Sequence, residues 1–247
     1  MAIPRLLHQT FPTAALPPEL AANVERLRRM NPGWTHTLYD DAACEDFIRA
    51  EYKPVYLQAY RSIDPRYGAA RADFFRYLLI YRRGGVYLDI KSVTTRPLDE
   101  TLTRDDRCVL AYWPNRLRED FPDWGVFDEL AGLPRGEFQS WHVIAEPLHP
   151  FLHAAVETVL QRIRDYDAMR DGVGRMGVLR TTGPIAYTQA ILPLLPSHPH
   201  RLAGTHLDLG LRYDAFDDQG PGSHWRFLPP PHYSQLDAPL VGSGATA

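Results

Sequence analysis

Three charged side chains between residues 73 and 89 are spaced so that they could act on one ligand. Asp73 and Arg76 are three residues apart in a segment with helical periodicity, so they share one face of that helix. Asp89 directly follows a β-favouring run at 86–88. Ligands of open α/β sheets bind beyond the carboxyl ends of the strands, where this carboxylate is expected. The alternatives that need no ligand are a surface ion pair for Asp73 and Arg76 and a turn-capping role for Asp89.

The surrounding segment, 69–91, predicts a helix, a glycine turn and a buried strand. Apolar or aromatic residues recur from Ala70 onward at positions 74, 77, 78 and 81, which is the spacing of a helix with one packed face. Gly84 and Gly85 are expected to end this helix in the left-handed conformation that glycine adopts without strain. The following strand would then carry Asp89 to the edge of a sheet.

The segments on either side predict alternating strands and helices. Before residue 69 we expect strands at 3–9 and 34–39 and helices at 17–30, 41–52 and 55–63. Later we expect strands at 108–113 and 141–145, helices at 150–166 and 183–195, and only short strands and loops after Gly204. This order indicates an α/β protein with a Rossmann-like sheet flanked by helices. We expect one domain, 1–241, followed by a disordered tail, 242–247.

The composition excludes several classes of protein. A formal net charge of -3 provides no basic field for nucleic acid or an anionic membrane. Cys44 and Cys108 are the only cysteines, far too few for a disulfide scaffold. The longest hydrophobic block, 77–81, is much shorter than the roughly 20 residues that span a bilayer, and no signal peptide is recognisable. We expect a cytoplasmic protein, peripheral to a membrane at most, unless an anchor lies outside this sequence.

The charged residues and glycines of 73–89 also form a pattern that resembles a known family. The pattern is Asp-x-x-Arg followed by Gly-Gly-x-Tyr-x-Asp, and it resembles the sugar-binding region of glycosyltransferase family 32. That family includes initiating mannosyltransferases and capsular polysaccharide transferases, and it is distantly similar to the clostridial glucosylating toxins. The matching residues are Asp73, Arg76, Gly84, Gly85, Tyr87 and Asp89. One position departs, because Lys91 stands where the family has the second aspartate of its Asp-x-Asp (DXD) motif.

The resemblance implies a fold and an activity. The fold would be the GT-A-type nucleotide-diphosphosugar transferase fold, with a mixed sheet. The activity would be that of a hexosyltransferase that moves a sugar from a UDP- or GDP-sugar to a hydroxyl group, with retention of configuration. The acceptor would be a saccharide, a lipid-linked molecule or a small molecule, in the synthesis of a polysaccharide, such as a capsule, or of a glycoconjugate.

The resemblance also implies site roles. Asp89 and Lys91 would be the catalytic residues at the donor diphosphate, with Asp89 holding a divalent cation, Mn²⁺ or Mg²⁺. His232 would add a metal or phosphate contact, with His224 and Trp225 in reserve. The donor sugar would be bound by Asp73, Arg76, Trp141 and Gly183, the last through backbone N–H groups of Thr182-Gly183-Pro184 at a helix start. The nucleotide would be contacted by His8, Phe11 and Tyr87.

Because of Lys91, the sequence leaves open whether a metal ion or the lysine itself binds the donor diphosphate. A protonated lysine cannot ligate a cation, so its ammonium could pair with the diphosphate directly and make the enzyme metal-independent. Alternatively, Lys91 points away along the strand, because alternate side chains face opposite sides, and Asp89 holds a metal with C-terminal residues. We expect the second arrangement. If Lys91 instead abolished activity, the protein would bind nucleotide sugars without turning them over.

Overall fold

The computed structural model describes residues 3–216, 223–228 and 230–242. Its main sheet has six strands in the order β2-β1-β3-β6-β5-β7. Strand β6 runs antiparallel to β3 and β5, whereas the other pairs are parallel, so the predicted mixed α/β sheet is confirmed. The strands are β1 Leu6–Thr10, β2 Thr35–Tyr39, β3 Gly85–Leu88, β5 Cys108–Tyr112, β6 His142–Ala145 and β7 Arg201–Thr205. A second sheet pairs β4 Val93–Thr94 with β8 Leu211–Arg212.

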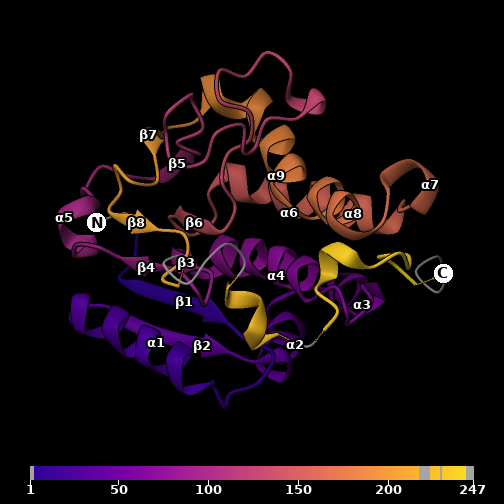
Figure 1. Ribbon diagram of the computed structural model, residues 1–247, viewed down its shortest axis with the longest axis horizontal. Helices are drawn as coiled ribbons and strands as arrows, with labels where there is room; N and C mark the ends of the chain where they lie inside the picture. The colour runs from indigo at the N-terminus through magenta and orange to yellow at the C-terminus, as the bar shows by residue number, and fades with distance from the viewer. Residues whose placement is uncertain (1–2, 217–222, 229, 243–247) are drawn as a thin grey trace.

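Helices cover both faces of the main sheet (Figure 1). The longer ones are α1 Pro18–Met30, α2 Asp41–Glu51, α3 Pro54–Ser62, α4 Gly68–Arg83, α6 Pro150–Arg164, α8 Gly174–Thr181 and α9 Pro184–Ile191. The short ones are α5 Leu98–Thr101, α7 Ala168–Asp171, η1 Asp128–Leu130, η2 Leu192–Ser197, η4 Ser223–Phe227 and η5 Tyr233–Gln235.

The alternation of side chains along the strands separates two hydrophobic cores. In β3, Tyr87 joins the core under α2, α3, α4, α6, α8 and α9, whereas Val86 and Leu88 join the core that contains Leu27 of α1. In β6, Val143 and Ile144 divide in the same way. Successive side chains of a strand point to opposite faces, so β3 and β6 contribute to both cores.

Helix α4 is buried nearly all round. Asp73 through Ile80 are all buried, so the predicted helix with a single packed face is wrong. The reason is tertiary: α4 contacts the sheet through β3 and β6, and it contacts α2 and α6 as well. A helix enclosed on several sides buries polar side chains along with apolar ones.

The two glycines after α4 are required by close packing. Gly84 has φ 65° and ψ −168°, which is a glycine-only conformation but not the predicted left-handed helical one. A Cβ at Gly84 would lie 2.6 Å from Cδ of Pro147, and a Cβ at Gly85 would lie 2.5 Å from the carbonyl oxygen of Leu6. Glycine therefore allows β3 to begin directly after α4 and to pair with β1.

The remaining differences from the predicted elements lie mainly in the second half. The helix expected at 183–195 divides into α9 and η2, because Pro193 has no N–H to continue the helical hydrogen bonds. Helix α8 was not predicted, since Gly174 and Gly177 lower its helix propensity. Strand β7 was not predicted either, because residues 201–205 lack a clear apolar alternation.

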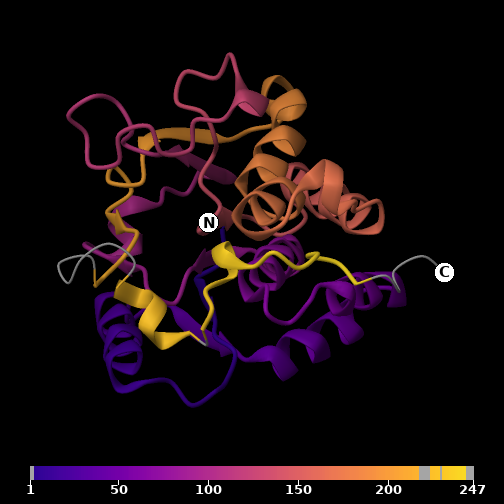
Figure 2. The same cartoon turned by 45° about the vertical axis from the view of Figure 1, so that its right-hand side comes forward.

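The C-terminal segment crosses the molecule to reach α3 and α8 (Figure 2). Val241 forms an isolated bridge with Ile63. The Tyr67 hydroxyl donates to the carbonyl of Ala238 at 2.6 Å and accepts the N–H of Gly174 at 2.9 Å. Both halves of the chain contribute to the main sheet and to both cores, although the single-domain organisation stays a prediction. Residues 243–247 of the expected tail lie outside the described residues.

None of the helices in the described ranges has the length and apolar character that crossing a membrane requires.

Candidate active site

Asp89 lies just beyond the carboxyl end of β3, as predicted. Its backbone N–H donates to the carbonyl of Trp141 at 2.9 Å, and its carbonyl accepts from Nε2 of Gln9 at 3.1 Å. These contacts fix the backbone of Asp89 to β1 and to the residue that precedes β6. The side chain is 23% exposed, so a ligand can reach the carboxylate.

Arg76 holds the centre of a buried charged network. Its Nη2 lies 3.1 Å from Oδ1 of Asp73 and 3.2 Å from Oδ1 of Asp89. Its Nη1 donates to the carbonyl of Ser140, and the guanidinium carbon lies 4.7 Å from the ring centroid of Tyr87. The side chains of Arg76 and Asp73 are only 5% and 8% exposed. The alternative of a surface ion pair is therefore wrong.

Asp73 receives a second contact from a distant part of the chain. The hydroxyl of Thr182, just before α9, donates to Oδ2 of Asp73 at 3.1 Å. Burial raises the pKa of Asp73 to about 6, although the positive charge of Arg76 opposes the shift. Each carboxylate oxygen has two lone pairs, so Asp73 can accept a ligand hydroxyl while keeping both protein contacts.

Lys91 points toward Asp89 rather than away from it. Its Nζ lies 3.9 Å from Oδ2 of Asp89 and donates to the hydroxyl of Tyr213 at 2.8 Å. Strand β3 ends at Leu88, and the N–H of Ser92 donates to the carbonyl of Asp89 at 2.8 Å, which closes a turn. Strand alternation therefore does not apply at Lys91, and the prediction that it points away is wrong. Burial opposes a charge on Lys91, but Tyr213 and Asp89 outweigh it and raise the pKa.

The three residues predicted to contact the nucleotide differ in their surroundings. Tyr87 is 1% exposed, lies against Arg76, and shares a 2.8 Å hydrogen bond with the hydroxyl of Thr10. His8 is 2% exposed, and its Nε2 donates to the carbonyl of Gly84 at 3.2 Å, within the core. Phe11 packs beside Leu20 and Phe216 in a small hydrophobic cluster. The structure thus brings Tyr87 to the charged network but not His8, and nucleotide contact stays a prediction for all three.

The predicted N–H site at Thr182-Gly183-Pro184 is wrong. The N–H groups of Thr182 and Gly183 both donate to the carbonyl of Val178, at 3.0 and 2.8 Å. Pro184 has no N–H to offer. This motif reaches the site through the hydroxyl of Thr182 instead, and a donor-sugar role for Gly183 stays a prediction.

Trp141 belongs to a group of aromatic side chains beside the charged network. Its ring centroid lies 5.4 Å from Tyr213 and 5.2 Å from His206. The indole Nε1 is buried, and no described residue accepts its hydrogen bond. We call the group the aromatic wall; it consists of Trp113, Phe121, Trp124, Trp141, His206 and Tyr213. An indole N–H and aromatic faces are suited to a sugar, which has hydroxyls and apolar C–H faces.

Glu137 is an acidic residue beside the wall that sequence reasoning missed. Its Oε1 accepts the indole N–H of Trp113 at 2.7 Å, and within the described part of the chain its Oε2 is buried without a partner. Burial raises the pKa of Glu137 to about 7. The sequence offered no signal beyond a single acid next to the segment 101–136, which matches the family pattern poorly.

The residues around Asp89 do not fit a divalent cation. Its two carboxylate oxygens face the cations Arg76 and Lys91, whereas a metal site requires several oxygen or nitrogen ligands around one point. The imidazole of His232 stacks on Trp225 at 4.1 Å, and its Nδ1 lies 2.8 Å from Oγ of Ser234. Among the described ranges no group of three His, Cys, Asp or Glu side chains is arranged to hold a metal. The side chain of His224 lies outside the described residues.

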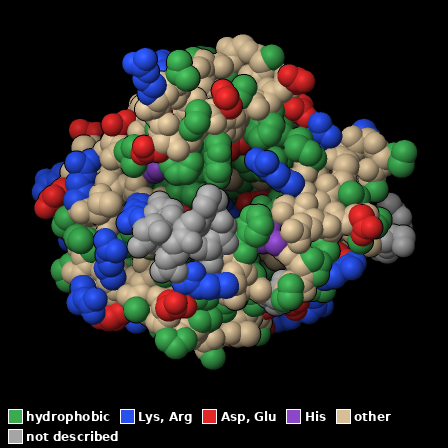
Figure 3. All heavy atoms as spheres, in the orientation of Figure 1, with side chains coloured by type: hydrophobic (Ala, Val, Ile, Leu, Met, Phe, Trp, Pro, Cys, Tyr) green, Lys and Arg blue, Asp and Glu red, His purple; other side chains and the backbone are tan. Residues whose placement is uncertain are grey.

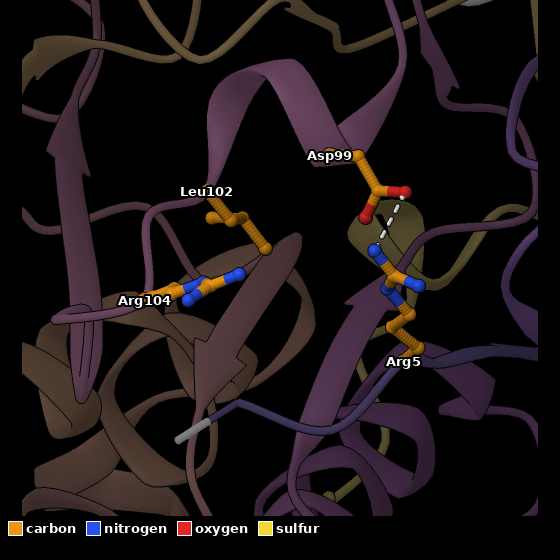
Figure 4. A pocket seen from close by; sticks show the side chains of 4 residues that line it. All are labelled: Arg5, Asp99, Leu102 and Arg104. Carbon is orange, nitrogen blue, oxygen red and sulfur yellow. Dashed lines mark ion pairs between the residues drawn. The ribbon is translucent and has the colours of Figure 1, made fainter. Parts of the chain in front are cut away.

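Figure 3 shows the face of the molecule seen in Figure 1, which is hollowed near its centre and has hydrophobic side chains above the hollow. A pocket of about 490 Å³ lies at the amino end of β1, where Arg5 and Asp99 face Leu102 and Arg104 (Figure 4). Because Arg5 precedes β1 and Asp89 follows β3, and these strands are parallel, the two sites lie at opposite ends of the sheet.

Comparison with known proteins shows similarity to glycosyltransferases in sequence and in fold. Residues 17–108 match the model of the family described as "Glycosyltransferase sugar-binding region containing DXD motif". Inositol phosphoceramide mannosyltransferase 3 of Schizosaccharomyces pombe is 27% identical over 184 residues, which are 74% of this chain and 43% of that protein. An initiation-specific alpha-1,6-mannosyltransferase of Candida albicans is 28% identical over 182 residues, 65% of this chain and 44% of that protein. The chain spans less than half the length of these relatives.

Solved structures share the fold at low identity. The PaToxG glycosyltransferase superposes with a TM-score of 0.57 at 15% identity, covering 78% of this chain and 70% of that one. The UDP-bound glycosyltransferase domain of the YGT toxin gives 0.55 at 9% identity, covering 89% and 82%. The predicted GT-A-type fold is confirmed, and residues 17–108 are similar to the sugar-binding region of a glycosyltransferase family. The matched region includes Lys91, which stands where the family pattern has its second aspartate.

Proposed function

We propose that this protein transfers a hexose from a UDP- or GDP-sugar to a hydroxyl acceptor, with retention of anomeric configuration. The observation that carries the proposal is the Asp73–Arg76–Asp89 network at the carboxyl end of β3, in which Asp73 and Arg76 are buried and Asp89 is partly exposed. Burying the charges of Asp73 and Arg76 is costly unless they are paired, and this network places two carboxylates and a guanidinium at the edge where sheet ligands bind. The curated relatives are named for mannose transfer, which makes mannose the first sugar to test.

The residues divide the substrate between them. Asp73 and Arg76 bind hydroxyls of the donor sugar, and the fixed carboxylate and guanidinium discriminate between sugars that differ in hydroxyl orientation. Asp89 and Lys91 lie at the donor diphosphate. The aromatic wall, with the indole N–H of Trp141, receives sugar or acceptor faces. The ring of Tyr87 packs against the guanidinium of Arg76 and helps to hold it in position.

In the reaction, the anomeric carbon of the sugar exchanges its bond to the diphosphate for a bond to the acceptor. The bond between the anomeric carbon and the diphosphate oxygen breaks, and its electron pair goes to the diphosphate. The acceptor oxygen bonds to the anomeric carbon, and its proton goes to the leaving diphosphate. The positive charges near Asp89 stabilise the negative charge that develops on that leaving group. The proposal also places the protein in the cytoplasm and its reaction in the synthesis of a polysaccharide or glycoconjugate.

The test is release of nucleoside diphosphate from a panel of donors, GDP-mannose and UDP-glucose first, with simple glycosides as acceptors. Wild-type protein should release GDP or UDP from one donor and form a glycosylated product. Asp73→Asn should lose most of this turnover, whereas the exposed Glu100→Gln on α5 should retain it. Donor binding with no release of nucleotide under any acceptor would favour the alternative, a non-catalytic protein that binds nucleotide sugars.

A further inference from the structure

The departure at residue 91 changes the formal charge of the site by the charge of one divalent cation. In the family pattern, a second aspartate at this position makes a site of three carboxylates and one guanidinium. Lysine in place of that aspartate removes one negative charge and adds one positive charge. The network of Asp73, Arg76, Asp89 and Lys91 is therefore formally neutral without a metal. The residues of the family pattern carry two net negative charges, and a bound divalent cation would neutralise them.

The ammonium is placed where that charge is needed. Its 3.9 Å separation from Oδ2 of Asp89 puts it beside the carboxylate that would otherwise be a metal ligand. A cation at Asp89 would therefore lie close to a second positive charge, which disfavours its binding. The Lys91 side chain is 11% exposed and Asp89 is 23% exposed, so an anionic ligand can approach the pair.

Tyr213 holds the ammonium in position. Lys91 Nζ donates to the Tyr213 hydroxyl at 2.8 Å and lies 3.9 Å from the centroid of its ring. The two segments are also joined through their backbones, because the N–H of Ala215 donates to the carbonyl of Lys91 at 2.8 Å. The hydroxyl of Ser92 donates to the carbonyl of Tyr213 at 2.7 Å. A flexible lysine side chain is thus preorganised, which lowers the entropic cost of using it on a ligand.

The sequence uses lysine sparingly elsewhere. Lys53 and Lys91 are the only lysines among 27 basic residues, so the remaining 25 are arginines. An ammonium is a compact point charge, whereas a guanidinium is a broad planar fork. A point charge is the closer side-chain equivalent of a metal ion.

We propose that the Lys91 ammonium, held by Asp89 and Tyr213, replaces the divalent cation at the donor diphosphate, so that donor binding and sugar transfer need no metal. It binds the diphosphate in the ground state and stabilises the negative charge when the bond to the sugar breaks. This proposal rests on the proposed function and specifies how the same site handles its donor.

The experiment is calorimetric binding of UDP and GDP to the whole chain, in EDTA and in Mn²⁺. The nucleotide that binds should bind equally well under both conditions, within about twofold. Lys91→Met should weaken binding by at least about 30-fold, the effect expected when one partner of a hydrogen-bonded charge pair is removed. Lys53→Met is the matched control and should bind like wild type. Lys91→Asp should bind only in Mn²⁺, since it restores the family's second aspartate.

The outcomes separate the two proposals. Wild-type binding that appears in Mn²⁺ and disappears in EDTA would overturn the role of Lys91 and leave the proposed function standing. Wild-type affinity in a folded Lys91→Met variant in EDTA would overturn it as well. If Lys91→Met fails to fold, the comparison of wild-type protein in EDTA and Mn²⁺ still decides. Absence of binding by either nucleotide in both conditions would overturn the proposed function itself.

Discussion

Arg76 lies 3.2 Å from the carboxylate of Asp89 although one side chain belongs to α4 and the other to the end of the next strand. Only Gly84 separates α4 from β3, so the strand begins directly after the helix. This is why a site that spans two elements can be written as one contiguous sequence pattern. The sequence pattern thus specifies a helix–turn–strand unit as well as the side chains of the candidate site.

Removal of the Arg76 guanidinium should strongly destabilise the fold. Arg76→Met would leave Asp73 and Asp89 without their shared cation, and breaking a buried ion pair by deleting one partner costs about 3–5 kcal/mol. We expect a loss of this size in the free energy of unfolding measured with urea at pH 7. Arg61→Met, which removes an exposed pair with Glu45, should leave the urea midpoint nearly unchanged. Equal midpoints for the two variants would contradict the central position of Arg76.

Alanine should be poorly tolerated at the turn that follows α4. Gly84→Ala places a Cβ 2.6 Å from Pro147 at a positive φ, so we expect a loss of about 2 kcal/mol or more in thermal unfolding. Gly68→Ala is the matched control, because no atom lies within 4 Å of its Cβ position at the start of the same helix. It should be neutral or slightly stabilising. A Gly84→Ala variant as stable as Gly68→Ala would show that the turn has another conformation.

The part of the site predictable from sequence is the part made by this contiguous unit. Helix α4, the glycine pair, β3 and the position of Asp89 all follow from periodicity and turn chemistry. The sequence placed the Thr182-Gly183-Pro184 motif at the site, but it could not predict the contact of the Thr182 hydroxyl with Asp73 or that of Tyr213 with Lys91, because these pairs are 109 and 122 residues apart. The direction of Lys91 was predicted wrongly because it depends on β3 ending at Leu88, and element ends are the least certain feature of a sequence.

The buried acid Glu137 should make stability fall as the pH rises. Its folded-state pKa of about 7 lies above the ordinary value of 4.5, so the native state holds a proton that the unfolded chain has lost between these values. The stabilisation is complete below pH 4.5 and is lost by pH 7 and above, to the extent of about 3 kcal/mol. Glu137→Gln should therefore show a smaller fall in unfolding free energy between pH 5 and pH 8.

Glu100→Gln, an exposed acid on α5, is the control for this experiment and should follow the wild-type pH dependence. If Glu137→Gln also follows it, the carboxyl of Glu137 is already ionised in the folded protein. That result would remove the basis for placing a neutral acid beside the aromatic wall.

The buried imidazole of His142 should make stability fall as the pH is lowered, which is the opposite of the effect of Glu137. Burial lowers its pKa to about 3, and neighbouring His206 adds to the shift, so the native state keeps the ring neutral. The unfolded chain takes up a proton near the ordinary value of 6.5, and stability is therefore lost as the pH falls from 6.5 toward 3. His142→Gln retains a donor for Oε1 of Gln139 and should lose less stability on acidification. His153→Gln, an exposed change on α6, should behave like wild type.

The most direct measurement is a crystal structure of the chain with bound UDP or GDP in EDTA. We predict that a diphosphate oxygen lies within about 4 Å of Lys91 Nζ, the usual limit for an ion pair, beyond the carboxyl end of β3. The pocket at the opposite end of the sheet contains two further cations, Arg5 and Arg104. A diphosphate bound there, with the Asp89–Lys91 pair unchanged, would contradict the account.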